Sequence, residues 1–127
     1  MSIRKVLVID DSSTDRSAIG GILARHGYRV MFAHDGEEGI ALARSEFPDL
    51  ILMDVVMPGM NGFQATRTLA RDPLTRHIPI VICSSKGEET DRLWGMRQGA
   101  QAYVVKPVAE QQLLDVLNAI AKAVPVG

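Results

Sequence analysis

The stretch Val6-Leu7-Val8-Ile9-Asp10-Asp11-Ser12 decides the fold, because four consecutive apolar residues stop abruptly at two aspartates. Three of the four apolar residues are β-branched, which favours a strand. The lack of alternation is typical of a strand that is covered on both faces. Ser12, or Ser13 beside it, is suited to cap a following helix. The stretch therefore predicts a buried parallel strand that leads through an acidic turn into a helix.

The same pattern recurs along the chain. Further apolar runs of three or four residues lie at 30–33, 50–53, 80–83 and 103–105. Helical patterns separate them: one ends at Gly27, one begins at Asp35 with Glu38 placed for a capping box, two span 63–71 and 88–98, and the last carries an apolar stripe at Leu113, Val116, Leu117, Ile120 and Val124. Strands that alternate with helices predict an α/β fold, a doubly wound five-stranded parallel sheet with helices on both faces.

The composition is that of one globular domain. The chain has 127 residues, of which 46% are apolar and 23% charged, and we expect a single domain over residues 1–127. Its 14 Lys and Arg against 15 Asp and Glu give a net charge of −1, which argues against binding of nucleic acid or an anionic membrane. Cys83 is the only cysteine, and no apolar run reaches the length of a membrane span. We therefore expect a cytoplasmic protein without membrane insertion.

Polar residues interrupt the pattern at the carboxyl ends of the predicted strands. They are Asp10, Asp11, Asp54, Ser84 and Lys106. In an open parallel sheet, ligands bind outside the carboxyl ends of the strands, where the winding reverses. If the strand order is 2-1-3-4-5, strands one and three are neighbours, and the three aspartates converge.

Converging carboxylates need positive charge. Two unit charges 4 Å apart repel by about 4 kcal/mol at an effective dielectric constant of 20. An all-oxygen site with two or three carboxylates suits Mg²⁺ or Mn²⁺, and Lys106 offers a second positive charge. A metal ion, an ammonium group and a hydroxyl are what a phosphoryl group needs around its oxygens. Asp54 would then be the nucleophile, because a carboxylate can accept a phosphoryl group as an acyl phosphate.

Three motifs in this order carry a family resemblance. Residues 8–12 (VIDDS), 53–62 (MDVVMPGMNG), and Gly99-Ala100 followed by 103–107 (YVVKP) resemble the receiver domain of two-component response regulators. The resemblance covers the whole chain and leaves no residues for an output domain. Residues 57–67, and the segment from Trp94 to Ala100, are most similar to the PilH-type regulators of type IV pilus twitching motility.

The resemblance implies a CheY-like, flavodoxin-like (βα)5 fold and a metal-dependent phosphoacceptor site. Asp54 is similar to the phosphoacceptor, with a histidine kinase as the donor. Asp11, Asp54 and the main-chain carbonyl of Val56 would bind Mg²⁺, and Asp10 would contribute through a water molecule. Lys106 would pair with a phosphoryl oxygen.

The resemblance also implies a switch. The Ser84 hydroxyl would move to the phosphoryl group, and Tyr103 would turn inward on activation. A downstream protein would then recognise the face that the fourth helix, fifth strand and fifth helix form. The Lys106–Pro107 peptide bond is expected to be cis, which proline makes accessible.

Other interpretations remain open. Taken singly, Asp10 and Asp11 can cap a helix and Asp54 can be an ordinary loop residue. The competing functions are a phosphate sink, a phosphorylation-independent scaffold, and a small Mg²⁺-dependent phosphatase that works through an aspartyl phosphate. Such phosphatases usually carry an acid two residues after the nucleophile, where this chain has Val56, so we expect a signalling module and no enzyme. A flavin site is disfavoured because Asp10 and Asp11 would repel its phosphate.

Overall fold

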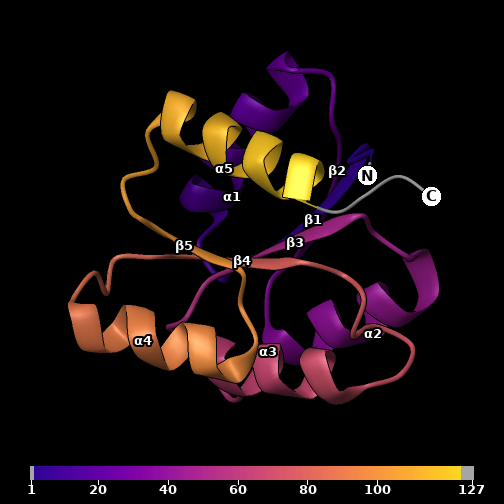
Figure 1. Ribbon diagram of the computed structural model, residues 1–127, viewed down its shortest axis with the longest axis vertical. Coiled ribbons are helices and arrows are strands. Elements are labelled where there is room, and N and C mark those ends of the chain that lie inside the picture. The colour runs from indigo at the N-terminus through magenta and orange to yellow at the C-terminus, as the bar shows by residue number, and fades with distance from the viewer. Residues whose placement is uncertain (1, 124–127) are drawn as a thin grey trace.

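The strands and helices alternate along the whole described chain. The computed structural model describes residues 2–123 and is shown in Figure 1. Its elements are β1 Lys5–Ile9, α1 Ser13–Arg25, β2 Arg29–Ala33, α2 Gly36–Glu46, β3 Leu50–Met53, α3 Gly62–Arg71, β4 Ile80–Ser84, α4 Glu89–Gln98, β5 Ala102–Val105 and α5 Glu110–Ala123. The five strands form one parallel sheet in the order β2-β1-β3-β4-β5, which confirms the predicted fold and strand order. None of the helices within residues 2–123 combines the length and the apolarity that crossing a bilayer requires.

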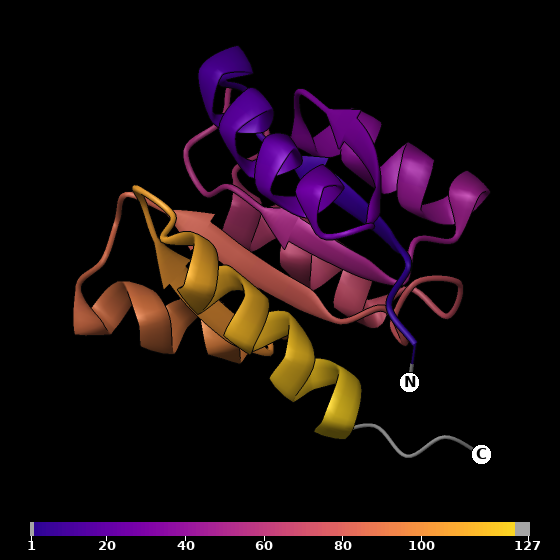
Figure 2. The ribbon, with the colours of Figure 1, turned by 90° about the horizontal axis from the view of Figure 1, so that it is seen from above.

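Each face of the sheet carries its own apolar core. Helices α1 and α5 cover one face, and α2, α3 and α4 cover the other (Figures 1 and 2). Successive side chains of a strand point to opposite faces, so Val6 and Val8 enter the first core while Leu7 and Ile9 enter the second. This division explains why the strand sequences are continuously apolar.

The edge strand β2 departs from the expectation that every apolar run is covered on both faces. It pairs only with β1, and Phe32, its fourth residue, is 44% exposed. All four residues of β3 and all five of β4 are buried, because these strands have neighbours on both sides and helices on both faces. The expectation of two-sided cover is therefore wrong for β2, since an edge position leaves part of its surface to solvent.

The predicted helix ends are mostly found. The Ser12 hydroxyl accepts a hydrogen bond from the Asp15 N–H and so caps α1, while Gly27 and Gly99, both with positive φ, follow α1 and end α4. The capping box expected at α2 is only half formed. Asp35 accepts the Glu38 N–H, but the Glu38 carboxylate pairs with Nδ1 of His34 instead.

A reciprocal capping box that the sequence analysis did not identify starts α3, between Asn61 and Gln64. At the other end of the chain, Val124 of the predicted α5 stripe lies outside the described residues.

Close packing at Gly62 fixes the turn from β3 into α3. A Cβ atom there would lie 1.9 Å from the carbonyl oxygen of Asp54, which is a backbone atom and cannot move aside alone. The Gly62 N–H also donates to the carbonyl oxygen of Val55, at 2.8 Å. The turn that follows Asp54 is therefore held against the end of β3, and it requires glycine.

This packing predicts opposite effects for two glycine substitutions. Gly62→Ala should lower the free energy of unfolding by about 2–4 kcal/mol, because the Asp54 carbonyl must shift. Gly21→Ala should raise it by about 0.5–1 kcal/mol, since Gly21 is helical and its nearest heavy atom is Nη1 of Arg25, at 3.5 Å from the added Cβ. Urea denaturation measures both, and a Gly62→Ala protein as stable as the wild type would contradict the account of the turn.

Candidate functional site

Three carboxylates meet at the carboxyl ends of β1 and β3. The Asp54 N–H donates to the carbonyl oxygen of Ile9, at 2.9 Å, and so ties the end of β3 to that of β1. One carboxylate oxygen from each of Asp10, Asp11 and Asp54 lies within 4.8 Å of the other two. Asp10 and Asp54 are buried, while Asp11 is exposed. The predicted convergence of the three aspartates is confirmed.

Lys106 reaches this cluster from the end of β5. Its Nζ lies 2.7 Å from Oδ2 of Asp10, 2.8 Å from Oδ2 of Asp15 and 3.5 Å from Oδ1 of Asp54. The Lys106 N–H donates to the carbonyl oxygen of Ser84, and the peptide bond to Pro107 is cis, as expected. Lys106 therefore contacts two of the three predicted acidic residues and a third carboxylate, that of Asp15, which the sequence analysis missed.

The surroundings of the site raise the pKa values of both Asp54 and Lys106. Burial and, second, the charge of Asp10 raise the pKa of Asp54 from 3.8 to about 6, although Lys106 and the Val55 N–H oppose the shift. Burial alone would lower the pKa of Lys106. Its hydrogen bonds to Asp10 and Asp15 and the charge of Asp54 outweigh burial, so the pKa lies above its ordinary value. The ammonium group is therefore a permanent cation in this pocket.

The donor set fits a hard divalent cation. Oδ1 of Asp10 accepts the Ser12 N–H and Oδ2 accepts Lys106, so both oxygens already have a hydrogen-bond partner. Asp11 has no hydrogen bond or ion pair within residues 2–123, and its carboxylate is free to turn toward a cation. Carboxylate and carbonyl oxygens are the ligands that Mg²⁺ prefers. The geometry therefore suits a cation held directly by Asp11 and Asp54, with Asp10 nearby but not in direct contact with it.

The expected switch residues lie next to the site but not in its open hollow. That hollow, about 400 Å³ in volume, is lined by Asp11, Ser12, Asp15, Asp54, Val56, Ser85, Lys106 and Pro107. Ser84 is fully buried, and its hydroxyl accepts the Lys86 N–H at 3.2 Å. Tyr103 is 8% exposed, and its hydroxyl donates to the Lys86 carbonyl oxygen. The Tyr103 ring is thus already inward here, and burial raises the pKa of its phenol.

Comparisons with known proteins agree with this site. The family described as response regulator receiver domain matches residues 6–118. The chain belongs to the response regulator receiver domains. Protein PilH of Pseudomonas aeruginosa is 50% identical over 116 residues, which cover 91% of this chain and 96% of PilH. The response regulator PleD of Caulobacter vibrioides is 38% identical over 109 residues, 86% of this chain but only 24% of PleD.

The chain also has the same fold as receiver domains of known structure. The chemotaxis protein CheY4 of Vibrio cholerae superposes with a TM-score of 0.87 at 31% identity, over 94% of this chain and 99% of CheY4. Receiver domains are signalling proteins of two-component systems, and they bind Mg²⁺ at an acidic cluster of the kind found here.

The raised pKa of Asp54 predicts a pH-dependent gain in stability for Asp54→Asn without metal. Above pH 6 the wild-type carboxylate is ionised in both native and unfolded states and destabilises the native state. As the pH falls through 6 toward 3.8 the native carboxyl binds a proton first, so the wild type recovers stability. Asp54→Asn should therefore be more stable than the wild type by about 1–2 kcal/mol at pH 8, and by clearly less at pH 5.

Denaturation in urea with a chelator measures this difference at both pH values. Asp49→Asn is the control, because the Asp49 carboxylate accepts the N–H groups of Arg4 and Lys5, and its loss should not stabilise the protein at pH 8. An Asp54→Asn protein with no advantage at pH 8 would refute the assignment of an electrostatic cost to this carboxylate.

Proposed function

We propose that this chain is a single receiver domain that accepts a phosphoryl group from a histidine kinase on Asp54, with Mg²⁺ as the required metal and Mn²⁺ as a substitute. The observation that carries the proposal is the Lys106 ammonium group, 3.5 Å from Oδ1 of Asp54 beside the aspartate cluster. A phosphoryl group on Asp54 would meet a cation on either side: the ammonium group and the metal.

The proposed transfer is an exchange of one bond to phosphorus. An oxygen of the ionised Asp54 attacks the phosphorus of a phosphohistidine, and the phosphorus–nitrogen bond breaks. The nitrogen keeps the bonding electron pair, and the product is an acyl phosphate. A bound Mg²⁺ would neutralise part of the negative charge that gathers at the site during the transfer. Asp54 provides the nucleophile and Lys106 orients the transferred group, while Asp11, Asp54 and the Val56 carbonyl would hold the metal.

The proposed output is a change in the face formed by α4, β5 and α5. Ser84 and Val105 are partners in adjacent strands, so movement at the end of β4 reaches β5 directly. The Tyr103 side chain packs from β5 against α4. Its ring is 3.3 Å from a Cβ built at Gly95, and the Arg92 guanidinium lies 5.8 Å from the ring centroid. Each 1.4 kcal/mol of differential stabilisation changes the ratio of two states tenfold, so a few charge-assisted bonds suffice.

The pathway is proposed from the likeness to PilH. Identity of 50% over nearly the whole of both chains supports a chemotaxis-like pathway that controls type IV pilus twitching motility. The partners would then be a histidine kinase and a downstream protein in the cytoplasm, without nucleic acid and without membrane insertion. The phosphate-sink alternative shares the same chemistry on Asp54. The phosphatase alternative is disfavoured, because Val56, a residue that is 56% exposed and lines the hollow, offers no acid.

Phosphorylation from a small donor tests the acceptor. Incubation with acetyl phosphate and Mg²⁺ should add one phosphoryl group to the wild type, and intact-mass spectrometry detects it. Asp54→Asn should add none, because an amide oxygen is too weak a nucleophile, and a chelator should abolish the reaction of the wild type. The control Asp49→Asn should react as the wild type does. A phosphorylated Asp54→Asn protein would contradict the proposal.

Replacement of Lys106 separates the phosphorylation of Asp54 from the proposed change in α4, β5 and α5. Lys106→Ala should still be phosphorylated on Asp54, but the amide NMR signals of α4, β5 and α5 should no longer shift on phosphorylation, because no ammonium group links the phosphoryl group to β5. Lys106→Arg keeps the charge and should retain part of the shift. Full wild-type shifts in a folded Lys106→Ala protein would show that the output does not run through this residue.

A further inference from the structure

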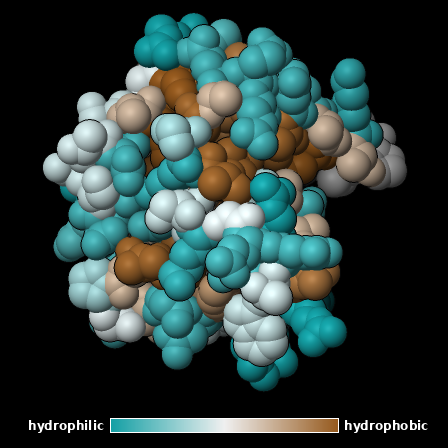
Figure 3. All heavy atoms as spheres, turned by 90° about the vertical axis from the view of Figure 1, so that its left-hand side faces the viewer, coloured by the Kyte–Doolittle hydropathy of each residue, from teal (hydrophilic) through white to brown (hydrophobic). Residues whose placement is uncertain are grey.

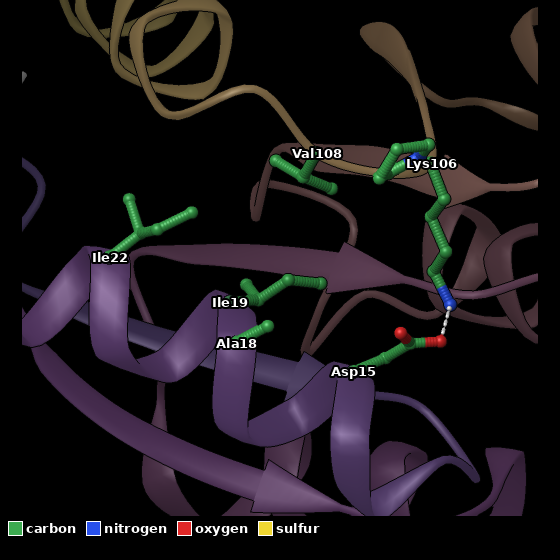
Figure 4. A pocket seen from close by; sticks show the side chains of 7 residues that line it. Asp15, Ala18, Ile19, Ile22, Lys106 and Val108 are labelled. Carbon is green, nitrogen blue, oxygen red and sulfur yellow. Dashed lines mark hydrogen bonds and ion pairs between the residues drawn. The ribbon is translucent and has the colours of Figure 1, made fainter.

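The carboxylate of Asp15 holds Lys106 although the mechanism above gives it no role. Asp15 lies in the first turn of α1, where its N–H donates to the Ser12 hydroxyl at 3.2 Å. Its Oδ2 accepts a hydrogen bond from Nζ of Lys106 at 2.8 Å, and Figure 4 shows this contact spanning from α1 to the end of β5. The Lys106 side chain is 13% exposed and the Asp15 side chain 41%. The contact therefore lies where the site opens to solvent.

The short hydrogen bonds of the Lys106 ammonium group go to residues other than Asp54, the proposed phosphoacceptor. The ammonium group has three N–H donors. Two form bonds of 2.7 and 2.8 Å with Asp10 and Asp15, while Oδ1 of Asp54 is 3.5 Å away, beyond normal hydrogen-bond length. A phosphoryl group on Asp54 must draw the ammonium group toward itself, against these two bonds.

Asp15 opposes that movement more directly than Asp10 does. Asp10 is buried in the aspartate cluster, so a bound cation would offset its charge. Asp15 is not part of that cluster, but it lines the same hollow as Asp54. A phosphoryl group brings a charge of about −1.5 to −2, which the ionised Asp15 repels across the hollow.

The surroundings keep Lys106 within reach of Asp15. A second hollow of about 120 Å³ lies behind the pair, lined mostly by apolar side chains of α1 and of the β5–α5 loop, among them Ala18, Ile19 and Val108 (Figure 4). Figure 3 shows apolar atoms exposed among hydrophilic ones in the half of the molecule that α1 and α5 form. Apart from Asp15 and Lys106 themselves, the side chains that line this hollow are apolar, so Asp15 is the polar side chain there that the ammonium group contacts.

We propose that Asp15 is a positioning residue that tethers Lys106 to α1 in the unphosphorylated protein and weakens binding of the phosphoryl group at Asp54. The tether rests on the proposed function and sets how readily the site accepts phosphate. Neutralising Asp15 replaces a charge-assisted bond to Lys106 with a weaker one and removes a repulsive charge, and both effects favour the phosphorylated state. Because the ion pair is partly exposed, its loss should have a small effect: the affinity for a phosphoryl analogue should rise about two- to fivefold.

The test measures binding of beryllofluoride, a phosphoryl analogue, in the presence of Mg²⁺ by amide NMR. Asp15→Asn should bind it about two- to fivefold more tightly than the wild type, and Asp15→Glu should restore the wild-type affinity. Glu46→Gln removes one exposed charge at the far end of α2 and should change nothing. The gain in Asp15→Asn should shrink in 0.5 M salt, since screening weakens exposed pairs.

The side-chain NMR signal of the Lys106 ammonium group gives an independent readout without ligand. It should shift in Asp15→Asn and keep its position in Glu46→Gln. A purely structural role of Asp15, as a charge favourable to the α1 N-terminus, predicts lower thermal stability and no tighter binding.

The outcomes separate the two proposals. Unchanged or weaker beryllofluoride binding by a folded Asp15→Asn protein, beside a wild type that binds, would overturn the tether and leave the proposed function intact. A wild type that binds no beryllofluoride with Mg²⁺ would overturn the proposed function, and the tether with it.

Discussion

Carboxylates at the ends of β1 and β3 lie too close together to stay ionised without positive charge beside them, and Lys106 supplies that charge from the end of β5. The ammonium group touches side chains from β1, from α1 and from β3, so one residue links three segments. Burial first, and the charge of Asp10 second, keep the pKa of Asp54 raised although Lys106 lies beside it. A divalent cation held among these carboxylates would reduce their repulsion, whereas a phosphoryl group would add negative charge that Lys106 and the cation would have to offset.

The topology of the fold brings these carboxylates together. Parallel strands bring all their carboxyl ends to one edge, and the reversal of winding between β1 and β3 leaves a gap that no crossover helix fills. The glycine at position 62 lets the chain turn directly against the Asp54 carbonyl, and the Ser12 cap fixes the start of α1 beside Asp10. The apolar strands hold these polar ends rigidly, since β3 and β4 are buried throughout.

Much of this arrangement could be predicted, because it follows from local patterns and a topological rule. The strand runs, the Ser12 cap and the terminal glycines are local features, and the strand order then brings Asp10, Asp11 and Asp54 together. Asp15 could not be found in this way. An acid in the first turn of a helix is ordinarily explained by the helix dipole, and its contact with Lys106 depends on two side-chain rotamers. The exposure of Phe32 likewise depends on β2 being an edge, and the inward ring of Tyr103 on packing across α4, neither of which a residue pattern records.

In the proposed mechanism, signalling through this site is a change in what Lys106 contacts. Without phosphate it is shared between Asp10 and Asp15, and in our account phosphate shifts it toward Asp54. A crystal structure of the protein with Mg²⁺ and beryllofluoride tests this account most directly. It should show the metal held by Asp11, Asp54 and the Val56 carbonyl, beryllofluoride on Asp54, and Lys106 bonded to a fluorine. A metal bound elsewhere, or Lys106 still shared between Asp10 and Asp15 with no contact to the analogue, would contradict it.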